Sequence, residues 1–492
     1  MAAATLPTDE PTTDGLTSLL SGSSLTPERF LADYWERTML HLPRDDPTTF
    51  GGLLQLEDMD ALLCCAACPA AWAELLVFKG LVQVDTYATP HVAFASGASL
   101  IVNHTDKVWR PANDLCAQLG RRFGHAYANL YLTPGDSQTA PPHSDDRDVF
   151  VLQLHGEKAW RVWSAEDART QPLPFTDEMV GKGEGELLAE EPLGEPSLRC
   201  ALQPGHLLYI PRGAPHVACT AGSASPSMHL TIAVPTADLS WSGFAMQAFA
   251  AATGHSRHAS LRPPAAELPF RRALPLGPLP PLPPPPPPVA TTSWAAAAGE
   301  AAAAPAAAAP PATTDVAAAA ADPTDAGGGA AAAAAGSAWS ETFGRLHAEL
   351  CAVSFAEARQ VLGEKLERKA REQRRALELV ARQMGARGAP APLRPGTVLG
   401  KQLEVELLDG GRVVQTRPAA GSGVPVRHTF IPPAMLPVVE EFMALRCPAT
   451  FTLAELQGPD PFLKACAVRQ LMALRAVVML AEEPAARSAN EV

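Results

Sequence analysis

The sequence predicts a mixed β and α protein whose main domain is a jelly roll or barrel of short strands. Three observations predict this fold class. Short apolar or alternating runs recur between residues 128 and 234, and Gly or Pro separates them. The connections between the runs are long, which is typical of jelly rolls and barrels. A histidine and an aspartate two positions apart, together with a second histidine more than 70 residues later, suit one metal ion, so sheet pairing must bring the distant histidine to the other two.

Five segments have the residue pattern of β-strands. Each is apolar or alternates apolar with polar residues, and each lies next to a turn signal. In chain order they are residues 128–133, 149–155, 159–163, 206–211 and 228–234. We expect these strands to form the walls of the domain.

His143, Asp145 and His216 are candidate metal ligands. In the triplet His143-Ser-Asp145, an extended backbone puts both side chains on one face. Two imidazoles and one carboxylate leave the opposite face of a metal open, which is the facial triad of non-heme Fe(II) oxygenases. The alternative is that His143 lies in a surface turn after Pro141 and Pro142, and that His216 satisfies a hydrogen bond in the core.

Several stretches closely resemble the JmjC-domain ribosomal oxygenases, a family with bifunctional lysine demethylase and histidyl hydroxylase members. They are Asn129-Leu-Tyr-Leu-Thr-Pro-Gly-Asp-Ser-Gln138, His143-Ser-Asp-Asp146, Phe150-Val-Leu-Gln-Leu-His-Gly-Glu-Lys-Ala-Trp-Arg-Val162, Gly205-His-Leu-Leu-Tyr-Ile-Pro-Arg-Gly213, His216 and Ser227-Met-His-Leu-Thr-Ile232. Motif, spacing and order agree over roughly residues 25–250. The resemblance implies a double-stranded β-helix (jelly-roll or cupin fold) that holds Fe(II) and uses 2-oxoglutarate as cosubstrate.

Lys158 is the candidate partner of the cosubstrate. In the family, a lysine on the strand after the His-x-Asp motif binds the far carboxylate of 2-oxoglutarate, and Lys158 occupies that place. Lys158 shares a strand face with Trp160 and Val162, so it would point inward beside apolar neighbours. A buried ammonium needs an anion, which a dicarboxylate held at the metal would offer. The alternative is a solvated lysine at a hairpin tip.

Asn129, Tyr131 and Thr231 are further candidates for binding the cosubstrate or orienting a ligand. Each alternates with apolar residues on an expected strand, and each could equally be a satisfied polar group of the core. Asp146 and Asp148 lie beside the triad but are not expected ligands. Asp146 should point away from Asp145, toward substrate or solvent.

Changes in composition divide the chain into five regions. They are a disordered lead at residues 1–24, the JmjC catalytic domain at 25–250, a Pro- and Ala-rich linker or insertion at 251–338, a helical region at 339–390 and a winged-helix-like domain at 396–484. In the family, helices corresponding to residues 339–390 form a dimerisation domain, so the resemblance implies a homodimer. The alternative is a helical hairpin packed on its own chain.

The last region alternates strand-like and helical segments, in the order of the family's winged helix. Strands are expected at residues 403–408, 412–416 and 477–480, and helices at 433–445, 453–456 and 460–474. The third helix has only Lys464 and Arg469 as cations. Nucleic-acid binding is therefore not expected to be its main role, and a packing or protein-contact role fits better.

Charge favours a basic partner. The 492 residues include 39 Lys and Arg against 52 Asp and Glu, a formal net charge of −13, which disfavours nonspecific binding to a phosphate backbone. Nine carboxylates between Glu166 and Glu195 would attract a basic ribosomal protein or a histone tail. The alternative is a solvated acidic loop without a partner.

Cysteine usage indicates reduced thiols and an intracellular protein. The nine Cys residues have no regular spacing, and no secretory pattern is expected at the start of the chain. Cys64, Cys65 and Cys68 lie in an expected helix over residues 59–76, and no second CxxC exists to complete a zinc site. No apolar run is long enough to cross a bilayer.

The sequence therefore predicts an Fe(II)- and 2-oxoglutarate-dependent dioxygenase that hydroxylates a protein side chain. The resemblance favours a histidine of a ribosomal protein as target, and a nuclear or nucleolar location. A JmjC histone lysine demethylase is the alternative within the class, because N-methyl hydroxylation uses the same oxidant. A cupin that does not use 2-oxoglutarate and a non-catalytic chromatin or ribosome-assembly scaffold are the alternatives from other classes.

Overall fold

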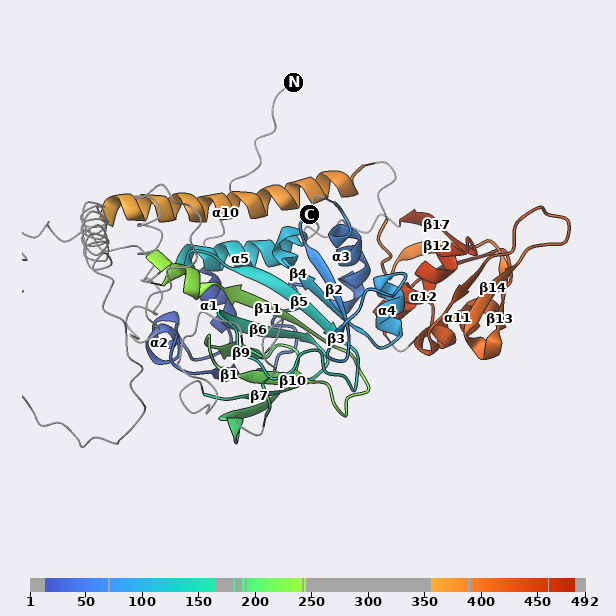
Figure 1. Ribbon diagram of the computed structural model, residues 1–492. Helices are drawn as coiled ribbons and strands as arrows, with labels where there is room; N and C mark the ends of the chain where they lie inside the picture. Colours follow the sequence, from blue (N-terminus) through green and yellow to red (C-terminus); the bar gives the residue numbers. More distant parts are fainter. Residues whose placement is uncertain are drawn as a thin grey trace, which may run out of the picture. The chain divides into compact units, whose positions relative to one another are not determined.

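The computed structural model describes residues 14–69, 71–164, 180–181, 188–190, 193–240, 243–244, 355–386, 391–458 and 460–482. The chain divides into two compact units. Residues 278–353 form one of them and lie outside the described residues, as does the whole of the expected linker at 251–338. Every described element belongs to the other unit (Figure 1).

A sandwich of two β-sheets forms the centre of the main domain. The larger sheet contains β1 (Leu40–Leu42), β2 (Glu74–Lys79), β3 (Val82–Gln83), β4 (Ser99–Asn103), β5 (Tyr127–Thr133), β6 (Asp148–His155), β9 (Leu207–Ile210) and β11 (Ser227–Val234), and the smaller contains β7 (Lys158–Val162), β8 (Leu198–Leu202) and β10 (His216–Cys219). Their orders are β1-β9-β6-β11-β5-β4-β2-β3 and β10-β7-β8. Val149 and Val151 of the larger sheet share a buried cluster with Trp160 and Val162 of the smaller, so the two sheets pack face to face.

This sandwich confirms the expected β architecture, and each of the five expected segments contributes a strand. In order they are β5, β6, β7, β9 and β11. The alternation that identified them places successive side chains on opposite faces. On β5, Leu130 and Leu132 are buried in the outer core, whereas Tyr127 belongs to the cluster between the sheets.

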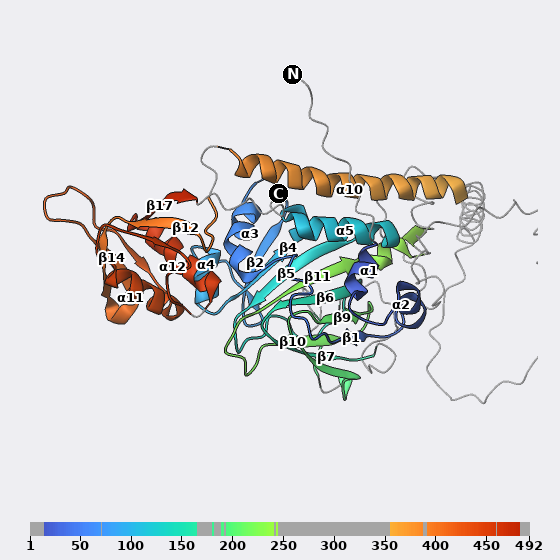
Figure 2. The same cartoon turned by 180° about the vertical axis from the view of Figure 1, so that it is seen from behind.

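Helices cover the outer face of the larger sheet. Helix α5 (Arg110–Phe123) buries Leu115, Cys116 and Leu119 at helical spacing, and Gly124 is its C-cap. The 30-residue helix α10 (Phe355–Met384) packs on α5 and on the short 3-10 helix η2 (Thr105–Lys107). Both views show α10 lying along α5 (Figures 1 and 2).

The apolar side of α10 is buried against its own chain. Leu362, Ala376, Leu377 and Val380 are all buried in the described protein. For this part of the helical region, packing within one chain therefore accounts for the burial of the apolar side chains. The homodimer stays a prediction, and residues 339–354 lie outside the described part.

The expected disorder of residues 1–24 is wrong where the structure describes them. Helix α1 (Gly15–Leu20) begins at the N-cap Asp14, whose carboxylate accepts a hydrogen bond from the Leu16 N–H, and it buries Leu16 and Leu19. The expected helical pattern after it is present as α2 (Pro27–Asp33), capped by Thr26. Residues 1–13 lie outside the described residues.

The expected helix at residues 59–76 is too long. After the 3-10 helix η1 (Leu56–Asp58), helix α3 spans only Met59–Ala66, and β2 begins at Glu74. Pro69 explains the early end, because a proline disfavours helical backbone at the residue before it and cannot donate a helix hydrogen bond. Helix α4 (Pro90–Ala95) then leads into β4.

The C-terminal region contains two small sheets and two main helices. Its elements are β12 (Thr397–Lys401), β13 (Glu404–Leu408), η5 (Asp409–Gly411), β14 (Val413–Arg417), β15 (His428–Phe430), η6 (Pro433–Met435), α11 (Leu436–Ala444), β16 (Ala449–Thr452), α12 (Pro461–Ala473) and β17 (Val477–Glu482). The sheet orders are β16-β12-β17 and β13-β14-β15. The assignment of this region as a winged helix stays a prediction.

The helix expected at residues 453–456 is absent from this part. The Leu453 N–H donates to the Thr397 carbonyl at 3.3 Å and the Ala454 N–H to the Pro395 carbonyl at 2.8 Å. These two hydrogen bonds continue the contact of β16 with β12 and the residues just before it. Residues 453–456 therefore form a turn at the end of β16. Among the described helices, none has the length and apolarity required to span a membrane.

Candidate metal centre

Main-chain pairing brings His143 and His216 together. The His143 N–H donates to the His216 carbonyl at 3.0 Å, and the His216 N–H donates to the His143 carbonyl at 2.8 Å. Their ring centroids are 4.3 Å apart. Asp145 joins them: one ligand atom from each of the three residues lies within 4.8 Å of the others, and the His216 Nε2 is 3.7 Å from an Asp145 carboxylate oxygen. Of the described residues, these three form the one such His, Cys, Asp and Glu cluster.

Backbone carbonyls orient the two imidazole rings so that Nε2 is the nitrogen of each that can bind a metal. The Nδ1 of His143 lies 2.8 Å from the Pro141 carbonyl oxygen, and the Nδ1 of His216 lies 3.0 Å from that of Ala214. A carbonyl only accepts, so each Nδ1 carries the proton and each Nε2 keeps its lone pair. This orientation of an imidazole by its other nitrogen is typical of metal ligands. The donor set therefore fits a divalent transition metal such as Fe(II).

A buried ionic network fixes the loop that precedes His216. Arg212 is fully buried and donates to the carboxylates of Glu36 at 2.5 Å and Asp148 at 3.1 Å. Tyr209 donates its hydroxyl hydrogen to Asp148 at 2.6 Å. Because Gly213, the next residue, donates its N–H to the Asp145 carbonyl at 2.9 Å, this loop is held to the backbone of the triad.

Lys158 lies inside the sandwich. Its side chain is buried, with 3% exposure, and its Nζ donates to the Thr133 hydroxyl at 2.9 Å. Burial lowers the pKa of Lys158 to about 7. The alternative of a solvated hairpin lysine is therefore wrong, and the ammonium lacks a carboxylate partner among the described residues. The hairpin requires glycine at position 156. Its φ of +61° is unfavourable for other residues, and a Cβ added there would lie 2.0 Å from the Pro226 carbonyl oxygen.

The three further candidates lie on two paired strands of the larger sheet, β5 and β11. Asn129 on β5 accepts a hydrogen bond from the His104 N–H at 3.0 Å, and Thr231 on β11 lies opposite it in register. The Tyr131 ring stacks on that of His229 at 4.8 Å. Asn129 thus already has a partner, and the roles proposed for Asn129, Tyr131 and Thr231 stay predictions.

Sequence reasoning did not identify Thr133 and His229, although both share the inward face that Asn129 and Tyr131 define. His229 is buried, and burial lowers its pKa well below the usual value, with Lys158 acting in the same direction. The alternation on β5 and β11 was sufficient to find both residues. Asp148, which sequence reasoning placed beside the triad, instead belongs to the buried network around Arg212.

Part of the acidic insert packs on the metal-ligand segment. The Ser144 N–H donates to the Val180 carbonyl at 2.9 Å, and Gly181, with φ +87°, passes so near that an added Cβ would lie 2.4 Å from the Pro142 carbonyl oxygen. Glu190 is bound by Arg161. Most of the insert, including Glu184, Glu186 and Glu191, lies outside the described residues.

In a comparison with known protein families, the model of the JmjC domain matches residues 101–239 of this chain. Ribosomal oxygenase 2 of Bos taurus is 31% identical over 240 residues, which are 45% of this chain and 48% of that protein. The bifunctional lysine-specific demethylase and histidyl-hydroxylase of Drosophila willistoni is 29% identical over 228 residues, which are 43% of this chain and 27% of that protein. The match thus spans about half or less of each relative's length.

Among solved structures, the ribosomal oxygenase YcfD of Escherichia coli in complex with cobalt and 2-oxoglutarate is similar to this chain. Its sequence identity is 14% and its TM-score 0.33, with 93% of this chain and 99% of that chain covered.

Proposed function

Given a JmjC domain at residues 101–239, we propose that this chain is an Fe(II)- and 2-oxoglutarate-dependent dioxygenase that hydroxylates a histidine side chain of a ribosomal protein. The observation that carries the proposal is the convergence of His143, Asp145 and His216 in a sandwich whose interior also holds Lys158. Three ligands on one side of a metal leave coordination positions for a cosubstrate and dioxygen.

Each residue has a distinct task in this proposal. The Nε2 atoms of His143 and His216 and the carboxylate of Asp145 would hold the metal, with the imidazoles oriented by backbone carbonyls. Lys158 would pair with the far carboxylate of the cosubstrate, which supplies the anion that its buried ammonium lacks. Bound iron with 2-oxoglutarate and dioxygen supplies the oxidant and yields succinate and carbon dioxide, and the protein determines which C–H bond is exposed to it.

The names of the relatives support the choice of target. Two of them are a ribosomal oxygenase and a protein with histidyl-hydroxylase and lysine demethylase activities. We therefore place histidine hydroxylation first and histone lysine demethylation second, since both begin with attack on a C–H bond. A basic protein substrate, a homodimer and a nuclear or nucleolar location belong to the same proposal.

The test is to incubate the purified full chain with Fe(II), 2-oxoglutarate and separated ribosomal proteins or methylated histones, and to map the products by mass spectrometry. The proposal expects a histidine that gains one oxygen atom, with matching succinate release. Loss of methyl groups from lysine instead would favour the demethylase. No change with either substrate set, together with succinate release no higher than for Asp145→Ala, would overturn the enzymatic proposal.

A further inference from the structure

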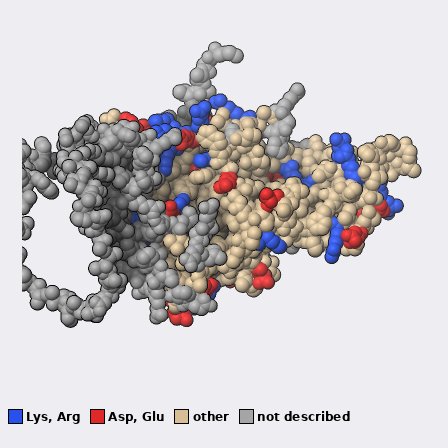
Figure 3. Space-filling view, viewed as in Figure 1, with Lys and Arg blue, Asp and Glu red and all other residues tan. Residues whose placement is uncertain are grey.

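Helix α10 carries arginines on the side that faces away from the rest of the chain. Over residues 368–382, its exposed charged side chains are five arginines and two glutamates, namely Arg368, Arg371, Arg374, Arg375, Arg382, Glu372 and Glu378. Blue side chains gather along the upper edge of the molecule in Figure 3, where Figure 1 places this helix. The chain has a formal net charge of −13, so this local excess of cations runs against its overall charge.

The helical repeat aligns four of these arginines. At about 100° per residue, Arg368, Arg371, Arg375 and Arg382 fall within a sector of about 60°. The opposite side of the helix packs on its own chain, where Leu377 is buried. At about 1.5 Å per residue, the four positions span about 21 Å along the helix axis. We refer to these four residues as the arginine row.

The protein itself neutralises little of the arginine row. Arg371 pairs with Glu367 at 3.1 Å, but the two side chains are 61% and 71% exposed, so the pair is solvated and weak. Arg368, Arg375 and Arg382 have no hydrogen-bond or ion-pair partner among the described residues. The alternative is a solvated helix face stabilised by ion pairs at i, i+4 spacing, and only one of the four arginines forms such a pair.

Helix α10 presents the arginine row from a fixed position. On its buried side, Gln373 donates through Nε2 to the Asp106 carboxylate at 2.8 Å and to the Ala126 carbonyl at 2.9 Å. Asp106 is itself buried, and it also accepts from the Ala128 N–H at 2.9 Å. The backbone positions of the arginines are therefore set by the packing of the helix before any partner binds.

A nucleic-acid backbone matches the arginine row better than isolated acidic side chains do. A single exposed ion pair contributes little to binding. A polyanion that runs along all four guanidinium groups instead gains from every contact, because each neutralised phosphate releases counterions. The planar guanidinium group also binds two phosphate oxygens at once. The overall negative charge of the chain does not prevent this contact, since exposed charges more than about 8 Å away are largely screened at physiological ionic strength.

The composition of α10 favours a double-stranded partner. Single strands are bound largely by stacking of their bases on aromatic side chains, and α10 has no aromatic residue after Phe355. A-form RNA duplexes, in contrast, are recognised mainly by their shape and their backbone. A symmetric contact of two copies through the arginine row would bring arginines together, so we expect the proposed homodimer to use another surface.

We propose that the arginine row of α10 binds the phosphate backbone of double-stranded RNA. The choice of RNA over DNA rests on the proposed function, because ribosomal proteins are bound to ribosomal RNA. This surface lies outside the JmjC domain at residues 101–239, and it would hold the enzyme beside a protein target that is carried on RNA.

The test measures binding of the full chain to a fluorescein-labelled RNA duplex of about 16 base pairs. Anisotropy is recorded at several KCl concentrations, without Fe(II) or 2-oxoglutarate. We expect the logarithm of the affinity to fall with the logarithm of the KCl concentration with a slope of about −3 to −4, one unit for each phosphate contact. This slope corresponds to a loss of roughly a hundredfold between about 50 and 200 mM KCl. A DNA duplex of the same sequence should bind more weakly.

The decisive variant replaces all four arginines of the row, as Arg368→Gln/Arg371→Gln/Arg375→Gln/Arg382→Gln. It should bind the RNA duplex at least about tenfold more weakly at low salt, with a slope shallower by about three to four. The matched control removes the same charge from four exposed positions outside α10, as Arg29→Gln/Arg37→Gln/Arg412→Gln/Arg446→Gln. The control should bind like the wild type, and both variants should keep its thermal midpoint because every replaced side chain is exposed.

Failure of the wild-type chain to bind the RNA duplex overturns the proposal, as does equal binding by the wild type and the folded row variant. Equal affinity for the RNA and DNA duplexes overturns the choice of RNA. Tighter binding of polyglutamate than of the RNA duplex at the same KCl concentration would assign the row to an acidic protein instead. Specific RNA binding without hydroxylation of any ribosomal protein would refute the proposed function and leave this surface standing.

Discussion

His143 and His216 are joined by two main-chain hydrogen bonds, of 3.0 and 2.8 Å, so the backbone holds the two ligand positions together independently of their rings. The segment that carries Asp145 is fixed in the same way, since its carbonyl accepts from the Gly213 N–H. The backbone thus sets the positions of the ligand residues without a contribution from their side chains. The side chains can therefore be removed without removing the scaffold.

The first prediction is that His143→Ala and Asp145→Ala each abolish stoichiometric iron binding and turnover while the fold persists. The measurements are iron content after gel filtration, succinate release and the thermal midpoint of unfolding. His41→Ala is the matched control, because His41 lies on the edge strand β1 and belongs to no described metal cluster. Full iron content and turnover in either triad variant would refute the assignment.

The second prediction concerns the cost of burying Lys158. Its pKa is about 7 in the folded protein and about 10.4 in an unfolded chain, so between these values the unfolded chain binds more protons. Stability therefore rises with pH through this window, and the cost is complete below about pH 7. Replacement by Met should stabilise the cosubstrate-free protein by roughly 1–4 kcal/mol at neutral pH, and by little near pH 10. Urea unfolding at both pH values is the check, and an equal effect at both would contradict the assigned pKa.

The third prediction is that the same Lys158→Met variant binds 2-oxoglutarate poorly. Loss of one partner of a buried ion pair costs about 3–5 kcal/mol, which is at least a hundredfold in affinity. Calorimetric titration of the iron-loaded protein measures the change. Arg161→Met is the control, since Arg161 lies on the same strand and binds Glu190 on the outer face. An unchanged dissociation constant would show that Lys158 does not contact the cosubstrate.

The fourth prediction is that Arg212→Met destabilises the JmjC domain strongly. The change leaves the carboxylates of Glu36 and Asp148 buried without their cation, at a cost of about 3–5 kcal/mol. For a domain of this size, the thermal midpoint should fall by roughly 6–20 °C. Iron affinity should fall as well, because Arg212 fixes the loop before His216. A midpoint within a degree or two of wild type would show that the network contributes little.

Local patterns were enough to predict the strands of the sandwich. The alternation on β5 and β7 follows from a pleated backbone between two packed layers, and together with the family resemblance it predicts that Lys158 points inward. Predicting that His143 lies beside His216 also needed the family resemblance, because no local pattern specifies which distant segment pairs with residue 143. The N-cap Asp14 and the spacing of Leu16, Leu19 and Leu20 indicate a helix. The small, polar composition of residues 1–24 as a whole hid this local signal.

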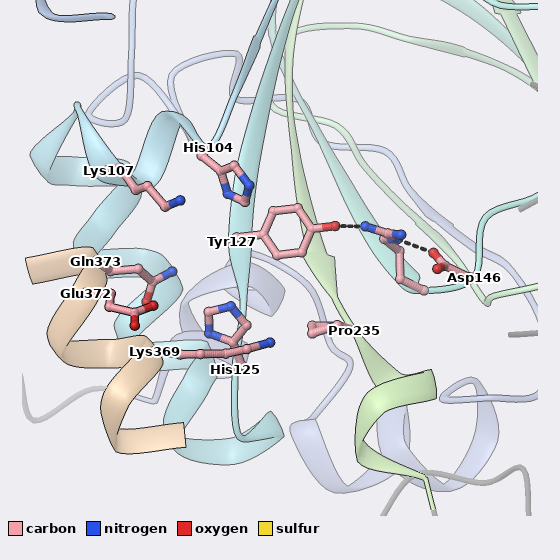
Figure 4. Close-up of a pocket in the computed structure, with 10 residues that line it drawn as sticks. His104, Lys107, His125, Tyr127, Asp146, Pro235, Lys369, Glu372 and Gln373 are labelled. Atoms are coloured by element: carbon pink, nitrogen blue, oxygen red, sulfur yellow. Dashed lines mark hydrogen bonds and ion pairs between the residues drawn. The ribbon is translucent and has the colours of Figure 1, made fainter. Parts of the chain in front are cut away.

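The pocket that Lys107, Arg147 and Lys369 line (Figure 4) could not be predicted because its walls come from distant parts of the sequence. Lys107 lies on η2, Arg147 in the loop before β6 and Lys369 on α10, and only the packing of α10 on α5 and η2 brings Lys369 to the others. The same is true of Gln373, which looks like an ordinary helix residue until its Asp106 partner is known. Long-range side-chain pairings of this kind leave no periodic trace in a single sequence.

The fifth prediction concerns Asp60 on α3, which joins the N-terminal part of the chain to the C-terminal region. Its buried carboxylate accepts from Arg469 on α12 at 2.5 and 2.8 Å and from the Leu393 N–H at 2.6 Å, and it lies 2.8 Å from the His91 Nε2. Burial opposes ionisation, but the hydrogen bonds from Arg469 and His91 outweigh it and lower the pKa of Asp60 to about 2. A carboxyl with a depressed pKa stabilises the fold above about pH 4, and the benefit is lost as pH falls toward 2.

Asp60→Asn should therefore lower the free energy of unfolding by roughly 2–3 kcal/mol at neutral pH. The difference from wild type should stay constant down to about pH 4 and shrink below it. Urea unfolding followed by tryptophan fluorescence across this range tests both statements. Asp58→Asn is the matched control, because Asp58 is more exposed and its pair with Arg394 is longer, at 3.8 Å. Superimposable unfolding curves for Asp60→Asn and wild type at neutral pH would mean that this ionic junction does not stabilise the contact between the two regions.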